Sequence, residues 1–85
     1  MNALGELYRE RKGTTVKISY DDSVDAAYIK LKSEDDRTPF GFTYCCDPAA
    51  VDGQINLDFD LDGRLIGVEV LFASRKLPSH LLKSA

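Results

Sequence analysis

Carboxylates around an Asp-Gly pair form the densest group of potentially reactive side chains. Asp58, Asp60, Asp62, Gly63 and Glu69 match the DxDxDGx5E pattern of EF-hand calcium loops. An EF-hand loop follows an amphipathic helix, whereas the preceding stretch QINLDF alternates apolar and polar side chains with a period of two. In a strand, Asp58 and Asp60 share one face while Asp62 lies in the turn, so these carboxylates cannot wrap around one ion. We expect no EF-hand site and no cofactor.

A second chemistry stays open for the same side chains. Asp58, Asp60 and Glu69 on one sheet face would form a divalent-cation site, and such a site could activate water as in a hydrolase. Solvent exposure explains these carboxylates equally well. Metal binding and hydrolysis are therefore kept as the alternative to a binding role.

The other reactive side chains form no recognisable catalytic set. Cys45 and Cys46 are adjacent, and adjacent side chains of a strand point to opposite faces, so they cannot form an ordinary disulfide with each other. His80 is the only histidine and lies far in sequence from the acidic cluster. No Gly-rich phosphate loop or zinc-ligand spacing is present. The sequence favours a protein that is not an enzyme.

The acidic cluster lies within a predicted β-hairpin, residues 54–72. Its Asp-Gly pair is typical of a two-residue type I′ loop, which would pair Leu61 with Arg64. This register sorts the side chains into two faces. The apolar face would hold the pairs Phe59/Ile66, Leu57/Val68 and Ile55/Val70, and the outer face Asp60/Leu65, Asp58/Gly67 and Asn56/Glu69.

Shorter patterns predict the remaining elements. Alternating apolar residues indicate strands over 15–20, 26–32 and 40–46, and Pro48 favours a single helical turn before the hairpin. Residues 1–14 form a predicted helical extension, and residues 77–85 a short C-terminal helix.

These elements predict a mainly β domain, on the border of α+β, that spans residues 1–85. We expect a five-stranded antiparallel meander over 15–72, with neighbouring strands adjacent in sequence and short N- and C-terminal helices. The predicted core-face residues are Val16, Ile18, Ile29, Leu31, Ile55, Leu57, Phe59, Ile66, Val68 and Val70.

The predicted outer face is not uniformly polar. Leu65 and Leu71 lie among its carboxylates, and Tyr28 shares the outward face of its strand with two lysines. A terminal helix or a second subunit would cover such a patch. Because small domains often gain their missing burial by association, we expect a homodimer.

Charge is distributed unevenly along the 85 residues. Residues 1–20 carry four basic and two acidic side chains, and residues 70–85 carry three basic and none acidic, so the net charge of −3 combines basic ends with a middle of −8. An acidic body suits a basic protein partner better than nucleic acid. Contact of nucleic acid with the basic termini is the alternative. No apolar run approaches a membrane span, and we expect a cytoplasmic protein with no membrane partner.

Two stretches carry a family resemblance: VKISYDDSVDAAYIKLK and INLDFDLDGRLIGVEVLFASRKLP. They resemble the small prokaryotic family catalogued as domain of unknown function 2283, through a K-I-x-Y-D opening, a D-A-x-Y-I-x-L strand, the acidic hairpin and a following A-S. The resemblance covers residues 16–78 and implies a small β-rich fold without assigned catalytic residues. Some members are encoded beside small predicted toxins, which implies an antitoxin-like role.

The sequence thus predicts a small non-enzymatic binding module. Its acidic sheet face would hold a basic protein partner encoded nearby, in an antitoxin-like manner. The predicted binding residues are Asp58, Asp60, Glu69, Leu65, Leu71 and Tyr28.

Overall fold

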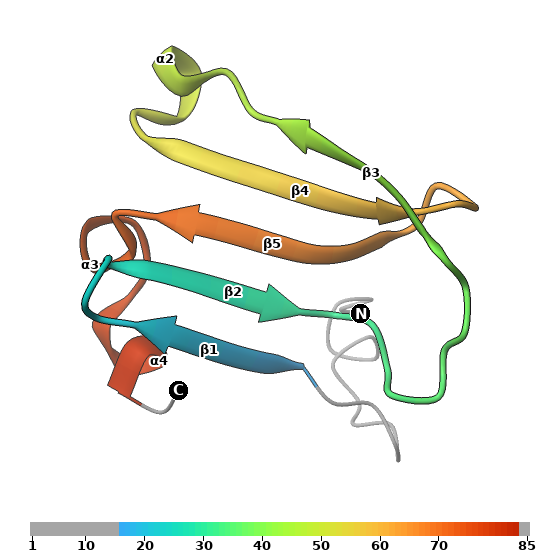
Figure 1. The fold of residues 1–85 in the computed structure, drawn as a ribbon. Helices are drawn as coiled ribbons and strands as arrows, with labels where there is room; N and C mark the ends of the chain where they lie inside the picture. Colours follow the sequence, from blue (N-terminus) through green and yellow to red (C-terminus); the bar gives the residue numbers. More distant parts are fainter. Residues whose placement is uncertain (1–15, 84–85) are drawn as a thin grey trace, which may run out of the picture.

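The computed structural model describes residues 16–83, which form one open sheet of five antiparallel strands with three short helices (Figure 1). In chain order the elements are β1 Lys17–Asp21, β2 Ala26–Lys30, β3 Phe40–Cys45, α2 Pro48–Val51, β4 Gln54–Asp60, β5 Leu65–Leu71, α3 Ala73–Lys76 and α4 Ser79–Lys83. The predicted mainly β fold is confirmed, as is the helical turn at Pro48. No helix in the described range is long and apolar enough to cross a membrane. The helix predicted over 1–14 lies outside the described residues.

The order of strands across the sheet corrects the predicted meander. The order is β1-β2-β5-β4-β3, so β5 and not β3 lies beside β2 (Figure 1). Residues 31–39 carry the chain past β5 and β4, a distance of about 14 Å at the usual strand spacing, which nine extended residues span easily. The pairing of β2 with β5 places Ile29 opposite Val68 and Ala27 opposite Val70. β5 is thereby the central strand, with β2 and β4 on either side of it, and β3 is left at the edge.

The central hairpin has the predicted register except near its turn. Leu57 lies opposite Val68 and Asp58 opposite Gly67, as predicted, but Phe59 lies opposite Leu65 and not opposite Ile66. The predicted two-residue turn is therefore wrong.

The loop holds three residues between Asp60 and Arg64. The Gly63 N–H donates to the Asp60 carbonyl (3.0 Å) and the Asp60 N–H donates to the Arg64 carbonyl (2.9 Å). Gly63 has a φ of +83°, as in a type I turn followed by a left-handed residue and a bulge. The Asp60 carboxylate selects this longer loop, because its Oδ1 accepts the N–H groups of Asp62 and Arg64, both at 2.9 Å.

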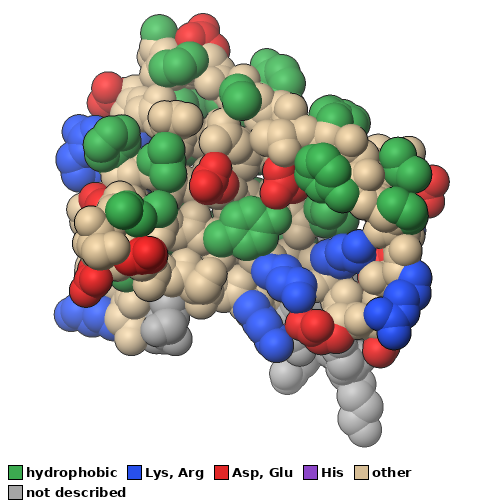
Figure 2. All heavy atoms as spheres, viewed as in Figure 1, with side chains coloured by type: hydrophobic (Ala, Val, Ile, Leu, Met, Phe, Trp, Pro, Cys, Tyr) green, Lys and Arg blue, Asp and Glu red, His purple; other side chains and the backbone are tan. Residues whose placement is uncertain are grey.

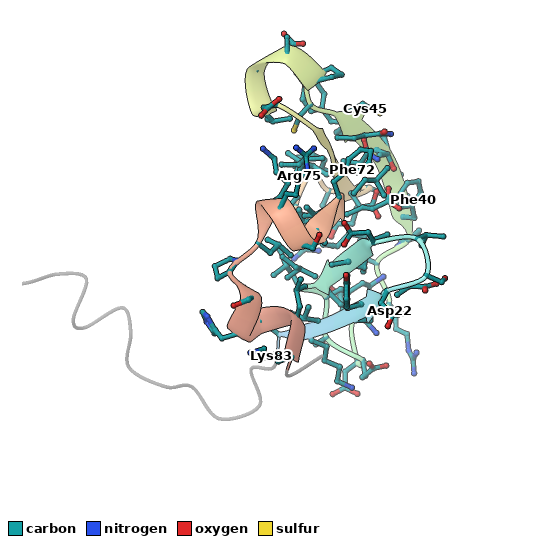
Figure 3. The ribbon with its side chains drawn as sticks, turned by 90° about the vertical axis from the view of Figure 1, so that its left-hand side faces the viewer. Asp22, Phe40, Cys45, Phe72, Arg75 and Lys83 are labelled. Atoms are coloured by element: carbon teal, nitrogen blue, oxygen red, sulfur yellow. The ribbon has the colours of Figure 1, made fainter. Side chains whose placement is uncertain are left out.

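One face of the sheet, which we call the apolar face, carries two rows of mainly hydrophobic side chains. Two rows cross the strands: Ile18, Ile29, Val68, Leu57 and Tyr44 in one, and Tyr20, Ala27, Val70 and Ile55 in the other. Figure 3 shows the sheet nearly edge-on, with α3 and α4 against one side of it. The core contains Ala27, Val70 and Ala73, all at most 3% exposed, with Leu77 and Leu82 of the helical end packed against it.

The helices cover only part of the apolar face. Among the predicted core residues Val70 is buried, but Val16 is 54% exposed and Leu31 is 37% exposed. The prediction of which residues share a face is therefore largely correct, whereas the prediction that they form a closed core is not. The physical reason is that α3 and α4 are short and lie at one end of the sheet.

Asp25 joins the β1–β2 turn to the start of α3. Its carboxylate accepts the Tyr20 hydroxyl (2.7 Å), the Ser74 N–H (2.9 Å) and the Ser74 hydroxyl (2.7 Å), and its carbonyl accepts the Ala73 N–H. The Ser74 hydroxyl, followed by the Tyr20 hydroxyl, lowers the pKa of Asp25. Phe72 adopts a φ of 55° at the same junction, which turns the chain sharply from β5 into α3. The helix predicted over 77–85 begins later, at Ser79, as α4, and its last two predicted residues lie outside the described range; α3 was not predicted.

Candidate functional site

The opposite face of the sheet, which we call the polar face, brings together most of the predicted binding residues. Figure 2 shows this face, with carboxylates over the middle of the sheet and basic side chains gathered toward the end of β2 and the β2–β3 connection. Two rows cross the strands: Ser19, Tyr28, Glu69, Asn56 and Cys45 in one, and Lys17, Lys30, Gly67, Asp58 and Thr43 in the other.

Tyr28 lies across Gly67 at the centre of the polar face. Its hydroxyl donates to Asp58 Oδ2 at 2.8 Å, and the other carboxylate oxygen of Asp58 accepts the Thr43 hydroxyl at 2.6 Å. A Cβ at Gly67 would lie 1.8 Å from the Tyr28 hydroxyl oxygen, so only glycine permits this path. Desolvation, the hydrogen bond to Asp58 and the charges of Asp58 and Glu69 raise the pKa of Tyr28 to about 12.

Glu69 is held by a neighbour on the other side of the hairpin. The Asn56 amide donates to Glu69 Oε1 at 2.8 Å, and Asn56 is itself only 9% exposed. Asn56 Oδ1 is buried without a hydrogen-bond partner among the described residues. Asp58 and Glu69 thus each have a donor within the domain that fixes the position of the carboxylate.

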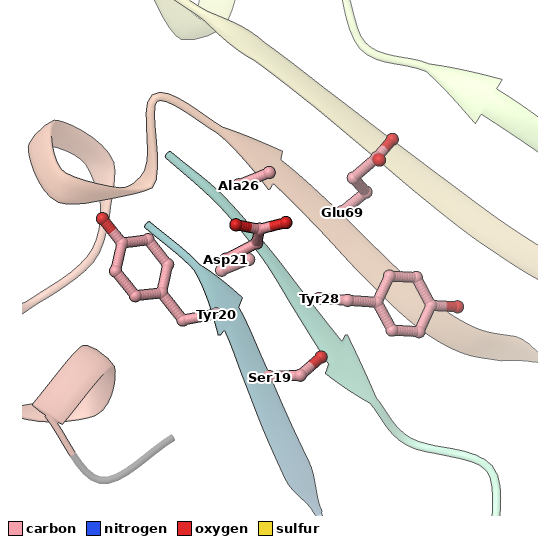
Figure 4. A pocket seen from close by; sticks show the side chains of 7 residues that line it. Ser19, Tyr20, Asp21, Ala26, Tyr28 and Glu69 are labelled. Atoms are coloured by element: carbon pink, nitrogen blue, oxygen red, sulfur yellow. The ribbon is translucent and has the colours of Figure 1, made fainter. Parts of the chain in front are cut away.

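A shallow hollow of about 260 Å³ opens on the polar face between β1, β2 and β5. Its lining residues are Ser19, Tyr20, Asp21, Ala26, Ala27, Tyr28 and Glu69. Figure 4 shows Asp21, Tyr28 and Glu69 around it on three different strands, with the Tyr20 ring turned toward the helices. The small side chains Ser19 and Ala26 leave the space that the larger ones surround.

Asp21 also caps the β1–β2 turn. It accepts the Ser23 hydroxyl at 2.6 Å and the Ser23 N–H at 3.0 Å, and these bonds, the hydroxyl first, lower its pKa. Asp21 therefore presents a negative charge at the hollow at neutral pH, in a position set by its own turn.

The basic end of the polar face is partly neutralised. Glu34 pairs with Lys30 at 2.8 Å and with Lys17 at 3.6 Å, and these lysines, Lys30 first, lower its pKa. The Lys32 ammonium donates to the Thr38 carbonyl. Lys17, Lys30 and Lys32 therefore already have partners within the domain.

The structure separates two predicted binding residues, Leu65 and Asp60, from the others. Tyr28, Asp58 and Glu69 lie together, and Leu71 pairs with Ala26 beside the hollow. Leu65 lies apart at the hairpin bulge and is 40% exposed.

Asp60 is not on an exposed acidic face. It is 1% exposed, and its carboxylate accepts the turn N–H groups and the Arg64 guanidinium at 3.2 Å. The backbone bond from Arg64 is the first cause of the lowered pKa of Asp60. The prediction treated Asp60 as an outer-face carboxylate because strand alternation does not show that a carboxylate at the end of β4 turns back to accept the N–H groups of the following loop.

Sequence reasoning did not name three contributors to the polar face, Ser19, Asp21 and Thr43, and it placed Asn56 on the outer face without naming it as a binding residue. The pairing of β1 with β2 could have indicated Ser19, because it lies opposite Tyr28. Thr43 could not be found this way, because the long connection between β3 and β4 leaves the register of this strand pair undetermined by the sequence, and with it the pairing of Thr43 with Asp58.

The EF-hand pattern does not form a site. Its three aspartates have separate partners: Asp58 binds Tyr28, Asp60 binds its own turn and Asp62 pairs with Arg64 at 3.2 Å. Over residues 16–83 no three His, Cys, Asp or Glu side chains converge closely enough to hold a metal ion. Cys45 and Cys46 are free thiols, and Cys45 is exposed on the polar face.

Comparison with protein families matches residues 17–74 to the model described as Protein of unknown function (DUF2283). The chain belongs to the DUF2283 family. No curated protein and no solved structure matches it significantly. In this DUF2283 protein, several residues of the recognised pattern hold the fold: Tyr20 and Asp25 bind each other, Ser74 binds Asp25, and Ala73 is fully buried.

Proposed function

We propose that this domain is a non-enzymatic protein-binding module that holds a Lys or Arg side chain of a basic partner in the hollow of its polar face. The composition of the hollow supports the proposal. Asp21 and Glu69 provide carboxylates from β1 and β5, and the Tyr28 ring lies beside them. A cation gains from charge-assisted hydrogen bonds to carboxylates and from contact with an aromatic face.

The side chains around the hollow need little reorganisation to bind. Asp21 is fixed by Ser23, Glu69 by Asn56 and Tyr28 by Asp58. Ordering a rotamer-rich side chain on binding typically costs about 0.5–1.5 kcal/mol, so this arrangement lowers the cost of association. Leu71, next to Ala26, offers an apolar contact at the edge of the same site.

The charge of the chain supports a basic partner. Residues 21–69 carry a net charge of −8, which speeds encounter with a positively charged protein and selects against acidic ones. A toxin encoded nearby, as the family resemblance suggests, is the partner we propose to test first. The basic end of the polar face favours nucleic acid less, because Glu34 already pairs with Lys17 and Lys30.

A nuclear magnetic resonance titration with Nα-acetyl-arginine amide tests the hollow directly. We expect weak saturable binding, with amide shifts concentrated at Ser19, Ala26, Tyr28 and Glu69 and a loss of affinity with added salt. Glu69→Gln keeps the shape of the side chain and should reduce the affinity severalfold. Asp22→Asn is the matched control, because Asp22 is exposed beside Asp21 but does not line the hollow.

Co-expression with each neighbouring gene product tests the partner. A retained neighbour should be lost on Glu69→Gln and kept on Asp22→Asn. Shifts spread evenly over the surface, or a neighbour retained equally by both variants, would show that the hollow is not the binding site.

A further inference from the structure

β3 is an edge strand with an unusual composition. Among the described residues its strand neighbour is β4 alone. The stretch Phe40–Cys45 contains no charged residue and no proline. Natural sheet edges are usually protected by charged side chains, proline or a covering element, because unpaired N–H and C=O groups are a template for another strand.

The edge also exposes aromatic side chains. Phe40 is 56% exposed, Phe42 is 52% exposed and Tyr44 is 55% exposed. The Phe42 ring stacks on Phe59 of β4, with ring centroids 4.9 Å apart and planes at 14°, so the aromatic surface continues from the edge onto the apolar face. Exposed apolar surface of this kind marks interaction sites in soluble proteins.

The backbone of β3 presents its outer hydrogen-bonding groups at known positions. The Cys46 N–H donates to the Ile55 carbonyl of β4 at 2.9 Å. Because hydrogen-bonding direction alternates along a strand, the N–H and C=O groups of Thr43 and Cys45 point away from β4. These groups are available to a strand added at this edge.

The opposite edge differs in each respect. β1 carries Lys17 and Asp21 at its two ends, and α4 lies against it. Charges and a neighbouring helix are the devices that block strand addition. The two edges of the sheet are therefore not equivalent: β3 has a bulge between Phe40 and Phe42, but its residues 42–45 are regularly paired and uncharged, and this part of the edge is open.

We propose that β3 pairs antiparallel with β3 of a second copy of this chain, around a two-fold axis at Thr43, to make one continuous sheet across the dimer. Two identical antiparallel strands satisfy two-fold symmetry by themselves, so the surface is self-complementary. No like charges meet, since Phe40–Cys45 has none. This register places Thr43 opposite the second Thr43 and Phe42 opposite the second Tyr44, and both kinds of pair stabilise sheets.

The pairing does not depend on the proposed binding of a basic partner. The hollow lies between β1, β2 and β5, while the dimer edge is β3, on the far side of β4. Dimerisation would leave the hollow of each copy open, so the two proposals can fail separately.

Two substitutions at Cys45 test the edge. Cys45→Pro removes the outward N–H and places the proline ring on the outer side, whereas Cys45→Ser keeps the N–H. We expect the wild-type protein and Cys45→Ser to sediment as dimers under reducing conditions. Cys45→Pro should raise the dimer dissociation constant by roughly 30-fold or more, because each copy loses one hydrogen bond across the interface and the dimer therefore loses two.

Disulfide crosslinking gives an independent readout that does not rely on the proline variant folding. In a background with Cys45→Ser and Cys46→Ser, Thr43→Cys should form a covalent dimer on mild oxidation, because directly paired positions lie within disulfide distance. Ser19→Cys in the same background, at an exposed site on β1, is the matched control and should give no covalent dimer on non-reducing denaturing gels. A monomeric wild-type protein, a folded Cys45→Pro dimer of unchanged affinity, or crosslinking at residue 19 as fast as at residue 43 would each overturn the proposal.

Discussion

The contact between Tyr28 and Gly67 yields a quantitative prediction about the polar face. In Gly67→Ala the new Cβ would lie 1.8 Å from the Tyr28 hydroxyl oxygen and 2.4 Å from the adjacent ring carbon. Carbon and oxygen atoms that are not bonded stay more than 3.0 Å apart. The Tyr28 side chain must therefore move by more than 1 Å, on the order of the difference between these distances, and its 2.8 Å bond to Asp58 breaks.

The expected cost follows from two opposing effects. A hydrogen bond to a charged group contributes about 1.5–3 kcal/mol, whereas alanine in place of glycine in a strand contributes about 0.5–1 kcal/mol in the opposite sense. Gly67→Ala should therefore lower the free energy of unfolding by about 1–2 kcal/mol. In a Tyr28→Ala background there is no ring to displace, and the same substitution should be neutral or stabilising by about 0.5 kcal/mol.

Urea denaturation of the four proteins of this double-mutant cycle measures the coupling, which we expect to be about 2 kcal/mol. Ultraviolet titration gives a second readout, because Gly67→Ala should move the pKa of Tyr28 from about 12 toward its ordinary value of 10.0. Gly53→Ala is the control, since the nearest atom to a Cβ there is the flexible end of Lys76 at 3.1 Å, and the Val51 carbonyl lies at an ordinary contact distance of 3.8 Å. A coupling below about 0.5 kcal/mol would refute the view that Gly67 is needed to accommodate Tyr28.

Three further predictions concern stability. The pKa of Tyr28 is raised to about 12, so the stability that its hydroxyl provides is complete below pH 10.0 and disappears as the pH rises toward 12. The urea midpoints of the wild type and of Tyr28→Phe should therefore converge over that range. Asp60→Asn should lower the urea midpoint more than Asp62→Asn, and because the Arg64 N–H lowers the pKa of Asp60, the difference should vanish as the pH falls well below 3.8. Ser74→Ala should lower the free energy of unfolding by about 1 kcal/mol and speed hydrogen exchange in α3 without changing it in β4. An equal increase in the exchange rates of α3 and β4 would contradict the link between α3 and the β1–β2 turn.

Local patterns were sufficient to predict the strands and the faces of the hairpin. Alternation with a period of two assigns each side chain to a face once the strand is recognised. The pairs Leu57/Val68 and Asn56/Glu69 are the same for the predicted two-residue turn and for the observed three-residue loop with its bulge. The error at Phe59 arose because an Asp-Gly pair suits both a two-residue loop and a three-residue loop with a bulge. The Asp60 carboxylate decided between them through hydrogen bonds that a residue pattern does not specify.

The sequence by itself determined the β-rich class, the apolar and polar sides of each strand and the acidic character of the middle of the chain. Only the tertiary structure decided that β5 lies between β2 and β4, because strand order depends on which apolar faces bury one another and not on the pattern within any one strand. That order brings Tyr28 over Gly67 to reach Asp58, 30 residues away, and places Asp21 and Glu69 around one hollow. It also leaves the aromatic β3 at an edge, because the long connection after β2 carries the chain to the far side of the sheet.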